Sequence, residues 1–139
     1  MRTDQVNIFI VEDDDIDIMA IRRSLKNVNI IGSIYVAKDG IEALEKLRAG
    51  NIPPPYIILL DLNMPRMNGI DCIKEIRLDP HLKQAIIFAL STSKDEKDKF
   101  QAYNYNVAGY IIKCDAGDDF DMAMRMLEQY LKVVELPNK

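Results

Sequence analysis

Two kinds of hydrophobic pattern alternate along the chain, and the first consists of short, nearly continuous apolar stretches. These stretches cover residues 6–11, 33–37, 56–62, 85–91 and 109–113. Apolar runs of this length, rich in Ile, Val and Tyr, are typical of strands buried on both faces of a sheet. The stretch YIILLDL over 56–62 is the most apolar, so we expect it at the centre of the sheet.

The second pattern places apolar residues at helical spacing in the segments between and after the strands. It predicts helices over residues 15–28, 39–50, 67–79, 94–106 and 118–134. Asp15 is a plausible N-cap of the first helix, and Gly50 and Pro80 are expected to end the second and third. The segment 94–106 is charged and has few apolar residues for a helix.

Five consecutive strand–helix units favour a parallel sheet covered by helices on both faces. Right-handed crossovers leave few topologies, and the leading one is a doubly wound, flavodoxin-like α/β fold with strand order 2-1-3-4-5. The length of 139 residues fits one domain spanning residues 1–139, with a core over about 6–133 and a short C-terminal tail.

Composition excludes several classes of protein. There is no apolar run of 18 residues and no secretory leader in MRTDQVN, which predicts a cytoplasmic protein without a membrane span. The net charge of -4 without a long basic run argues against nucleic-acid binding. Cys72 and Cys114 are too few for a disulfide framework, and the single His81 cannot form a histidine-based metal site.

A dense group of acids follows the first strand: Glu12, Asp13, Asp14, Asp15 and Asp17. Carboxylates this close repel one another and prefer water to the end of a hydrophobic strand. The last three fall in the first turn of a helix, where acids suit the helix dipole and are solvated by water. Glu12 and Asp13 need another explanation.

The carboxyl ends of parallel strands meet at one edge of the sheet, where ligands bind. The polar residues expected at this edge are Glu12 and Asp13, then Asp61 and Asn63, then Ser91 and Thr92, and finally Lys113. Three carboxylates without His or Cys form a hard oxygen site suited to Mg²⁺. Such a cation would offset the repulsion between Glu12 and Asp13.

Four motifs in this order, FIVEDD, ILLDLNMPRMNG, ALSTS and GYIIK, resemble those of response-regulator receiver domains (CheY-like) of two-component signalling. The resemblance covers about residues 6–133 and implies that Asp61 accepts a phosphoryl group from a histidine kinase or phosphotransfer protein. It implies Mg²⁺ held by Asp13, Asp61 and the main-chain carbonyl of Asn63, with Glu12 acting chiefly through water. Lys113 and Ser91 would contact phosphoryl oxygens.

The resemblance also implies how the signal leaves the domain. Ser91 and Tyr110 would switch on phosphorylation, changing the face formed by the fourth helix, fifth strand and fifth helix. Phe100, Tyr103 and Tyr105 are either partner contacts on that face or simple packing residues. The partners would be a downstream protein or a second copy of the chain. No output domain follows in this sequence, so a relay, a phosphate sink and a switch remain open.

Three alternatives use the same residues. A Mg²⁺-dependent phospho-aspartyl phosphatase usually has a second acid two residues after the nucleophile, and that position is Asn63. A phosphorylation-independent interaction module usually lacks one of the site residues, and none is missing. A flavin site needs a Ser/Thr/Gly-rich phosphate loop after the first strand, where EDDDID stands instead. By the same resemblance, Asn63 and Ser93 would tune dephosphorylation.

One position departs from the family. Receivers usually carry proline after the strand-5 lysine, joined by a cis bond, but here Cys114 follows Lys113. A non-proline cis bond costs about 2.5–4 kcal/mol, so we expect a trans bond, with Gly117 giving the loop its freedom. Lys113 should still reach the acidic pocket, and Cys114 is expected to be a plain thiol.

Overall fold

The computed structural model describes residues 5–30, 32–92, 95–113 and 120–137. The strands are β1 (Asn7–Val11), β2 (Ile34–Ala37), β3 (Tyr56–Asp61), β4 (Ile86–Ser91) and β5 (Gly109–Ile112). The helices are α1 (Asp15–Leu25), α2 (Gly40–Arg48), α3 (Gly69–Leu78), α4 (Glu96–Asn104) and α5 (Asp121–Val133).

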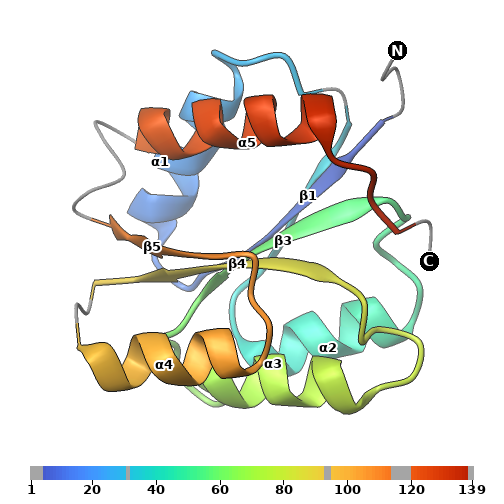
Figure 1. Ribbon diagram of the computed structural model, residues 1–139, viewed down its shortest axis with the longest axis vertical. Helices are drawn as coiled ribbons and strands as arrows, with labels where there is room; N and C mark the ends of the chain where they lie inside the picture. Colours follow the sequence, from blue (N-terminus) through green and yellow to red (C-terminus); the bar gives the residue numbers. More distant parts are fainter. Residues whose placement is uncertain (1–4, 31, 93–94, 114–119, 138–139) are drawn as a thin grey trace.

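The strands form one parallel sheet in the order β2-β1-β3-β4-β5, which confirms the predicted fold class and topology. The sheet lies between two helical layers, with α1 and α5 on one face and α2, α3 and α4 on the other (Figure 1). Strand β3 is central and buried along its whole length, as its apolar sequence predicts.

Alternate residues of each strand feed two separate cores, because successive side chains of a strand point to opposite faces. On β3, Ile58 and Leu60 pack toward α2 and α3, while Ile57 and Leu59 pack with residues of α1 and α5. This double burial explains why the strands are continuously apolar instead of alternating.

Several helix boundaries differ from those predicted. Asp14, not Asp15, caps α1: its backbone is extended, and its Oδ1 accepts a hydrogen bond from the Ile16 amide at 2.9 Å. Asp15 is instead the first helical residue. Helix α4 spans only Glu96–Asn104, because Asp95 caps its start and Asn106 takes a left-handed φ of 62° after its end.

The ends of α2 and α3 follow the expected signals, whereas the start of α5 differs from the predicted one. Gly50 adopts a left-handed φ of 74° just after α2, and Asp79 is extended before Pro80 at the end of α3. Helix α5 begins only at Asp121, because Phe120 has a left-handed φ of 67°. Among the described residues, no helix is both long enough and apolar enough to cross a membrane.

Candidate functional site

Strand register brings the predicted polar residues together at the carboxyl edge of the sheet. Val11 pairs with Leu60, so Glu12 and Asp61 lie side by side just beyond that pair. Farther along the sheet, Ser91 pairs with Ile112, the residue before Lys113. The site therefore combines residues from β1, β3, β4 and β5.

Three carboxylates form the centre of this site. One oxygen from each of Glu12, Asp13 and Asp61 lies within 4.8 Å of the other two. Glu12 is fully buried and Asp61 is 3% exposed, whereas Asp13 is open to solvent. An all-oxygen donor set with one solvent-facing side fits a hard divalent cation that keeps some of its waters.

Lys113 provides positive charge beside these acids, as the sequence predicted. Its Nζ lies 2.9 Å from Glu12 Oε1 and 3.5 Å from Asp61 Oδ2. Burial alone would lower the pKa of Lys113, but a hydrogen bond to Asp17 and the nearby Glu12 outweigh it and raise that pKa above its ordinary value. Lys113 therefore remains charged at neutral pH.

The environment of Glu12 disfavours ionisation of its carboxyl group. Burial, followed by the charge of Asp61, raises the pKa of Glu12 to about 8 despite the opposing effect of Lys113. Its Oε2 accepts a hydrogen bond from the Asp14 amide at 3.2 Å. Within the described part of the chain, its buried Oε1 accepts no hydrogen bond of good geometry, although the Lys113 ammonium is close. The Lys113 ammonium is therefore the charged partner of that oxygen.

Asp17 belongs to this site, which corrects the expectation that it is solvated by water like Asp14 and Asp15. Its Oδ2 accepts a hydrogen bond from Lys113 Nζ at 2.9 Å, and its side chain is only 25% exposed. Local sequence carries no signal for this contact, because Lys113 lies 96 residues farther along the chain.

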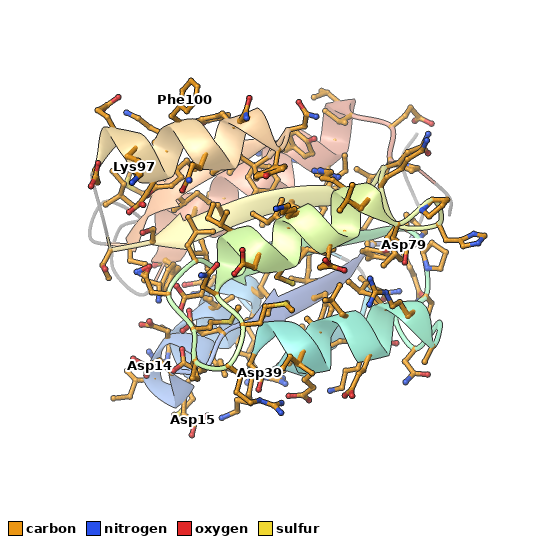
Figure 2. All side chains as sticks on the ribbon, turned by 90° about the horizontal axis from the view of Figure 1, so that it is seen from below. Asp14, Asp15, Asp39, Asp79, Lys97 and Phe100 are labelled. Atoms are coloured by element: carbon orange, nitrogen blue, oxygen red, sulfur yellow. The ribbon has the colours of Figure 1, made fainter. Side chains whose placement is uncertain are left out.

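The other two acids match the expectation. Asp14 caps the helix, and Asp15 forms an exposed ion pair with Lys38. Figure 2 shows both side chains at the start of α1, on the outer edge of the molecule.

Asn63 lies in the loop between β3 and α3, directly after the acidic centre. The backbone amide of Asn63 donates a hydrogen bond to Asp61 Oδ1 at 3.1 Å, so the loop itself orients the Asp61 carboxylate. The Gly69 amide donates to the Leu62 carbonyl at 3.0 Å and closes the loop at its base. A Cβ atom at position 69 would lie 2.5 Å from the Asp61 carbonyl oxygen, so only glycine allows this closure.

The two residues predicted to switch lie on the neighbouring strands β4 and β5. Ser91 is fully buried at the end of β4. Tyr110 is half-buried on β5 and packs against the core shared with α2 and α3. Ser93, Cys114 and the Lys113–Cys114 bond lie outside the described residues, and so does Gly117.

The aromatic residues of the α4 region have different environments. Phe100 is 71% exposed and Tyr103 is 49% exposed, and Figure 2 shows Phe100 projecting outward from α4. Tyr105 is half-buried and packs against the core below α4. Phe100 and Tyr103 are therefore accessible to a partner, whereas Tyr105 packs inside the fold.

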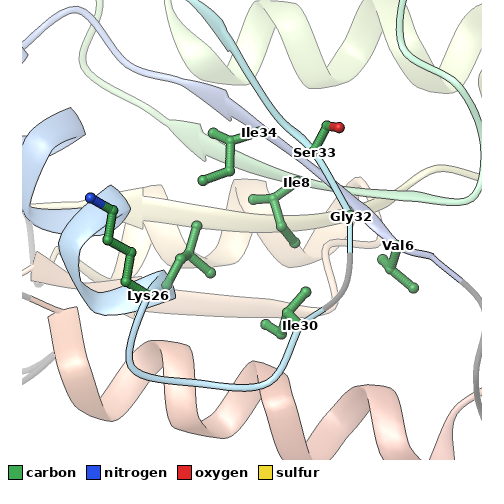
Figure 3. Close-up of a pocket in the computed structure, with 8 residues that line it drawn as sticks. Val6, Ile8, Lys26, Ile30, Gly32, Ser33 and Ile34 are labelled. Atoms are coloured by element: carbon green, nitrogen blue, oxygen red, sulfur yellow. The ribbon is translucent and has the colours of Figure 1, made fainter.

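A hollow of about 200 Å³ lies at the opposite end of β1 from the acidic site (Figure 3). Val6, Ile8, Ile30 and Ile34 line it, with Lys26 at its rim. Among the described residues that line it, none is one that the sequence predicts to carry the chemistry.

Comparison with known proteins agrees with this geometry. The family model described as "Response regulator receiver domain" matches residues 8–132. The response regulator Rcp1 of Synechocystis sp. is 33% identical over 135 residues, covering 94% of this chain and 92% of Rcp1. The chemotaxis protein CheY1 of Helicobacter pylori is 33% identical over 100 residues, covering 70% of this chain and 79% of CheY1.

Solved structures give the same result. The phosphorylated cyanobacterial phytochrome response regulator RcpA superposes with a TM-score of 0.86 at 34% identity, covering 96% of this chain and 99% of RcpA. The Mn²⁺-bound form of response regulator Rcp1 superposes with a TM-score of 0.85 at 32% identity, with the same coverage.

Proposed function

The chain belongs to the response regulator receiver domain family, and we propose that it accepts a phosphoryl group on Asp61 from a histidine kinase or phosphotransfer protein. One observation carries this proposal: at the carboxyl edge of the sheet, the buried Asp61 carboxylate has two further carboxylates within 4.8 Å and the Lys113 ammonium 3.5 Å away. This arrangement supplies a nucleophile together with opposite charge for an incoming anion.

In the proposed reaction, an Asp61 carboxylate oxygen attacks the phosphorus of a phosphohistidine. The new bond joins phosphorus to that oxygen, the bond from phosphorus to the imidazole nitrogen breaks, and the leaving imidazole keeps the electron pair and takes up a proton. A carboxylate and a phosphoryl group repel each other, so catalysis consists mainly of positioning and charge neutralisation. Lys113 would contribute a point charge to the phosphoryl oxygens, and Ser91 a hydroxyl donor.

The oxygen ligands fit a divalent cation, and we assign Mg²⁺ to Asp13, Asp61 and the Asn63 main-chain carbonyl, with Glu12 acting through water. When bound, the cation neutralises charge on the phosphoryl oxygens and on the clustered carboxylates. The close grouping of the three carboxylates supports this assignment. The existence of a Mn²⁺-bound form of the similar protein Rcp1 supports divalent binding in this family.

Phosphorylation would add about -1.5 to -2 charges, by analogy with other phosphoryl groups. Ser91 and Tyr110 are the proposed switch residues, because they lie on the two strands between Asp61 and the sheet edge. The proposed output face is formed by α4, β5 and α5. The exposed Phe100 and Tyr103 on α4 support a protein partner there.

A phosphatase is less well supported, since Asn63 cannot donate a proton as the usual second acid does. We propose that Asn63 and Ser93 instead control water access to the phosphorylated Asp61.

The proposed function is tested by incubation with acetyl phosphate, with and without Mg²⁺, followed by measurement of the intact mass of the protein. We expect one added phosphoryl group only with Mg²⁺, and no continuous turnover of p-nitrophenyl phosphate. Steady ester turnover would favour a phosphatase, and absence of labelling in folded protein would favour a phosphorylation-independent module.

A further inference from the structure

The loop between β3 and α3 is attached to the start of α2 by an ion pair that the proposed chemistry does not use. Arg66 donates to Asp39 Oδ2 through Nε at 2.7 Å, and its Nη2 lies 2.6 Å from the same oxygen. Asp39 is buried although it is charged, with 7% of its surface exposed. Figure 2 shows Asp39 at the start of α2, on the same side of the molecule as Asp14 and Asp15.

The two oxygens of Asp39 have separate roles. Oδ1 accepts a hydrogen bond from the Glu42 amide at 2.8 Å and caps α2, while Oδ2 binds Arg66. The hydrogen bond from Glu42, and then the Arg66 guanidinium, lower the pKa of Asp39 against the effect of burial. The cap of α2 and the loop of Arg66 are therefore joined through one carboxylate.

A second contact reinforces this attachment. A Cβ atom at position 40 would lie 3.0 Å from the Met67 carbonyl oxygen, so the absence of a side chain at Gly40 lets the loop approach α2. Arg66 itself has a left-handed φ of 63°. A residue with a side chain avoids that conformation unless surrounding contacts hold it there. The Met67 backbone amide donates to the Pro65 carbonyl at 2.7 Å across Arg66, and the Asp39 contact and the Met67 packing add to this turn.

The same loop carries Asn63, three residues before Arg66. The loop base is fixed by the Leu62 amide bonded to the Leu90 carbonyl at 2.9 Å and by the Gly69 closure. Asp39 holds the far end of the loop. Asn63 lies between these two attachments, and its amide contacts Asp61.

From these contacts we propose that Arg66 is a positioning residue: its ion pair with Asp39 fixes the β3–α3 loop and thereby sets the affinity of the acidic site for a divalent cation. The inference rests on the proposed function, since it takes the Asn63 carbonyl as a metal ligand. Its physical basis is that groups supporting a metal ligand control affinity through the ligand's orientation.

The first test measures Mn²⁺ binding from the free Mn²⁺ signal in electron paramagnetic resonance, with Mg²⁺ as competitor. We expect Arg66→Ala to weaken binding about tenfold, at the lower end of effects of outer-shell partners. Arg66→Lys keeps the charge but loses the paired donors, so its affinity should fall between those of Arg66→Ala and the parent. Asp39→Asn, which keeps an oxygen for the helix cap, should resemble Arg66→Ala.

The double variant distinguishes this ion pair from two unrelated effects. If Arg66 and Asp39 act through one contact, the double substitution should weaken binding no more than either single substitution. Arg48→Ala is the matched control, because Arg48 is also partly exposed and pairs with Glu75 and Asp79, but at the opposite end of α2. That variant should bind Mn²⁺ like the parent.

The second readout is the Mg²⁺ dependence of labelling by acetyl phosphate. Arg66→Ala should raise the half-saturating Mg²⁺ concentration without lowering the maximal rate. If the parent binds Mn²⁺ and the Mn²⁺ affinity of Arg66→Ala is within about twofold of the parent's, the inference is overturned and the proposed function stays intact. A lower maximal rate at unchanged Mg²⁺ dependence would also overturn it. A parent that binds neither ion would overturn the proposed function itself.

Discussion

Lys113 Nζ lies 2.9 Å from Oε1 of the fully buried Glu12, although the two residues come from opposite ends of the chain. The pair links the ends of β1 and β5 across the carboxyl edge of the sheet. Asp13, Asp17 and Asp61 also lie near this pair, so the site contains more acidic groups than the single Lys113 can neutralise. This imbalance determines how the protein should respond to pH, to metal and to substitution.

Stability of the metal-free protein should fall as pH rises through the titration of Glu12. The pKa of Glu12 is raised to about 8 in the fold, so the folded state favours the protonated form. The resulting stability is fully present below the ordinary pKa of a glutamate and is lost as pH rises through about 8. Glu12→Gln should remove this pH dependence, which amounts to a change of at most a few kcal/mol in the unfolding free energy. Urea unfolding in EDTA across this range measures it, and parallel pH profiles for both proteins would contradict the assignment.

Asp13 should be essential for metal binding and unfavourable without metal. It contributes a carboxylate to a cluster that already contains Glu12 and Asp61. Asp13→Asn should weaken Mg²⁺ binding at least about tenfold, and it should raise the metal-free unfolding free energy by relieving repulsion. Calorimetric titration and urea unfolding test the two effects. Unchanged Mg²⁺ affinity would exclude Asp13 as a ligand.

Two acids in the first turn of α1 provide a matched comparison. Asp17 pairs with the largely buried Lys113, whereas Asp15 pairs with the exposed Lys38. Both interact similarly with the helix dipole, so that contribution cancels. Asp17→Asn should lower the unfolding free energy by about 1 kcal/mol, and Asp15→Asn should change it little. Equal effects in chemical denaturation would show that the Lys113 contact adds nothing.

The fold was predictable because each level of the sequence supports the same architecture. The continuous apolar strands indicated a sheet covered on both faces, and the order 2-1-3-4-5 followed from parallel connections. Residues at strand ends were predictable for the same reason: the positions of Glu12, Asp61, Ser91 and Lys113 depend on strand register alone.

Helix termini and side-chain partners were less predictable. Asp14 and Asp15 are equally good caps by residue type, and only the backbone conformation decides that Asp14 caps α1. The contact of Asp17 cannot be predicted from local sequence, because its partner Lys113 comes from the far end of the chain. The Arg66–Asp39 ion pair has no signal in local sequence, since it joins two loops whose distance depends on the packing of α2 and α3.

The central claim, that Asp61 is the sole phosphoacceptor, is tested most directly by intact mass after incubation with acetyl phosphate and Mg²⁺. The parent should gain one phosphoryl group, and Asp61→Asn should gain none while retaining its fold. Asp71→Asn, which removes an exposed acid in the first turn of α3, is the control and should be labelled like the parent. Labelling of Asp61→Asn equal to that of the parent would contradict the account.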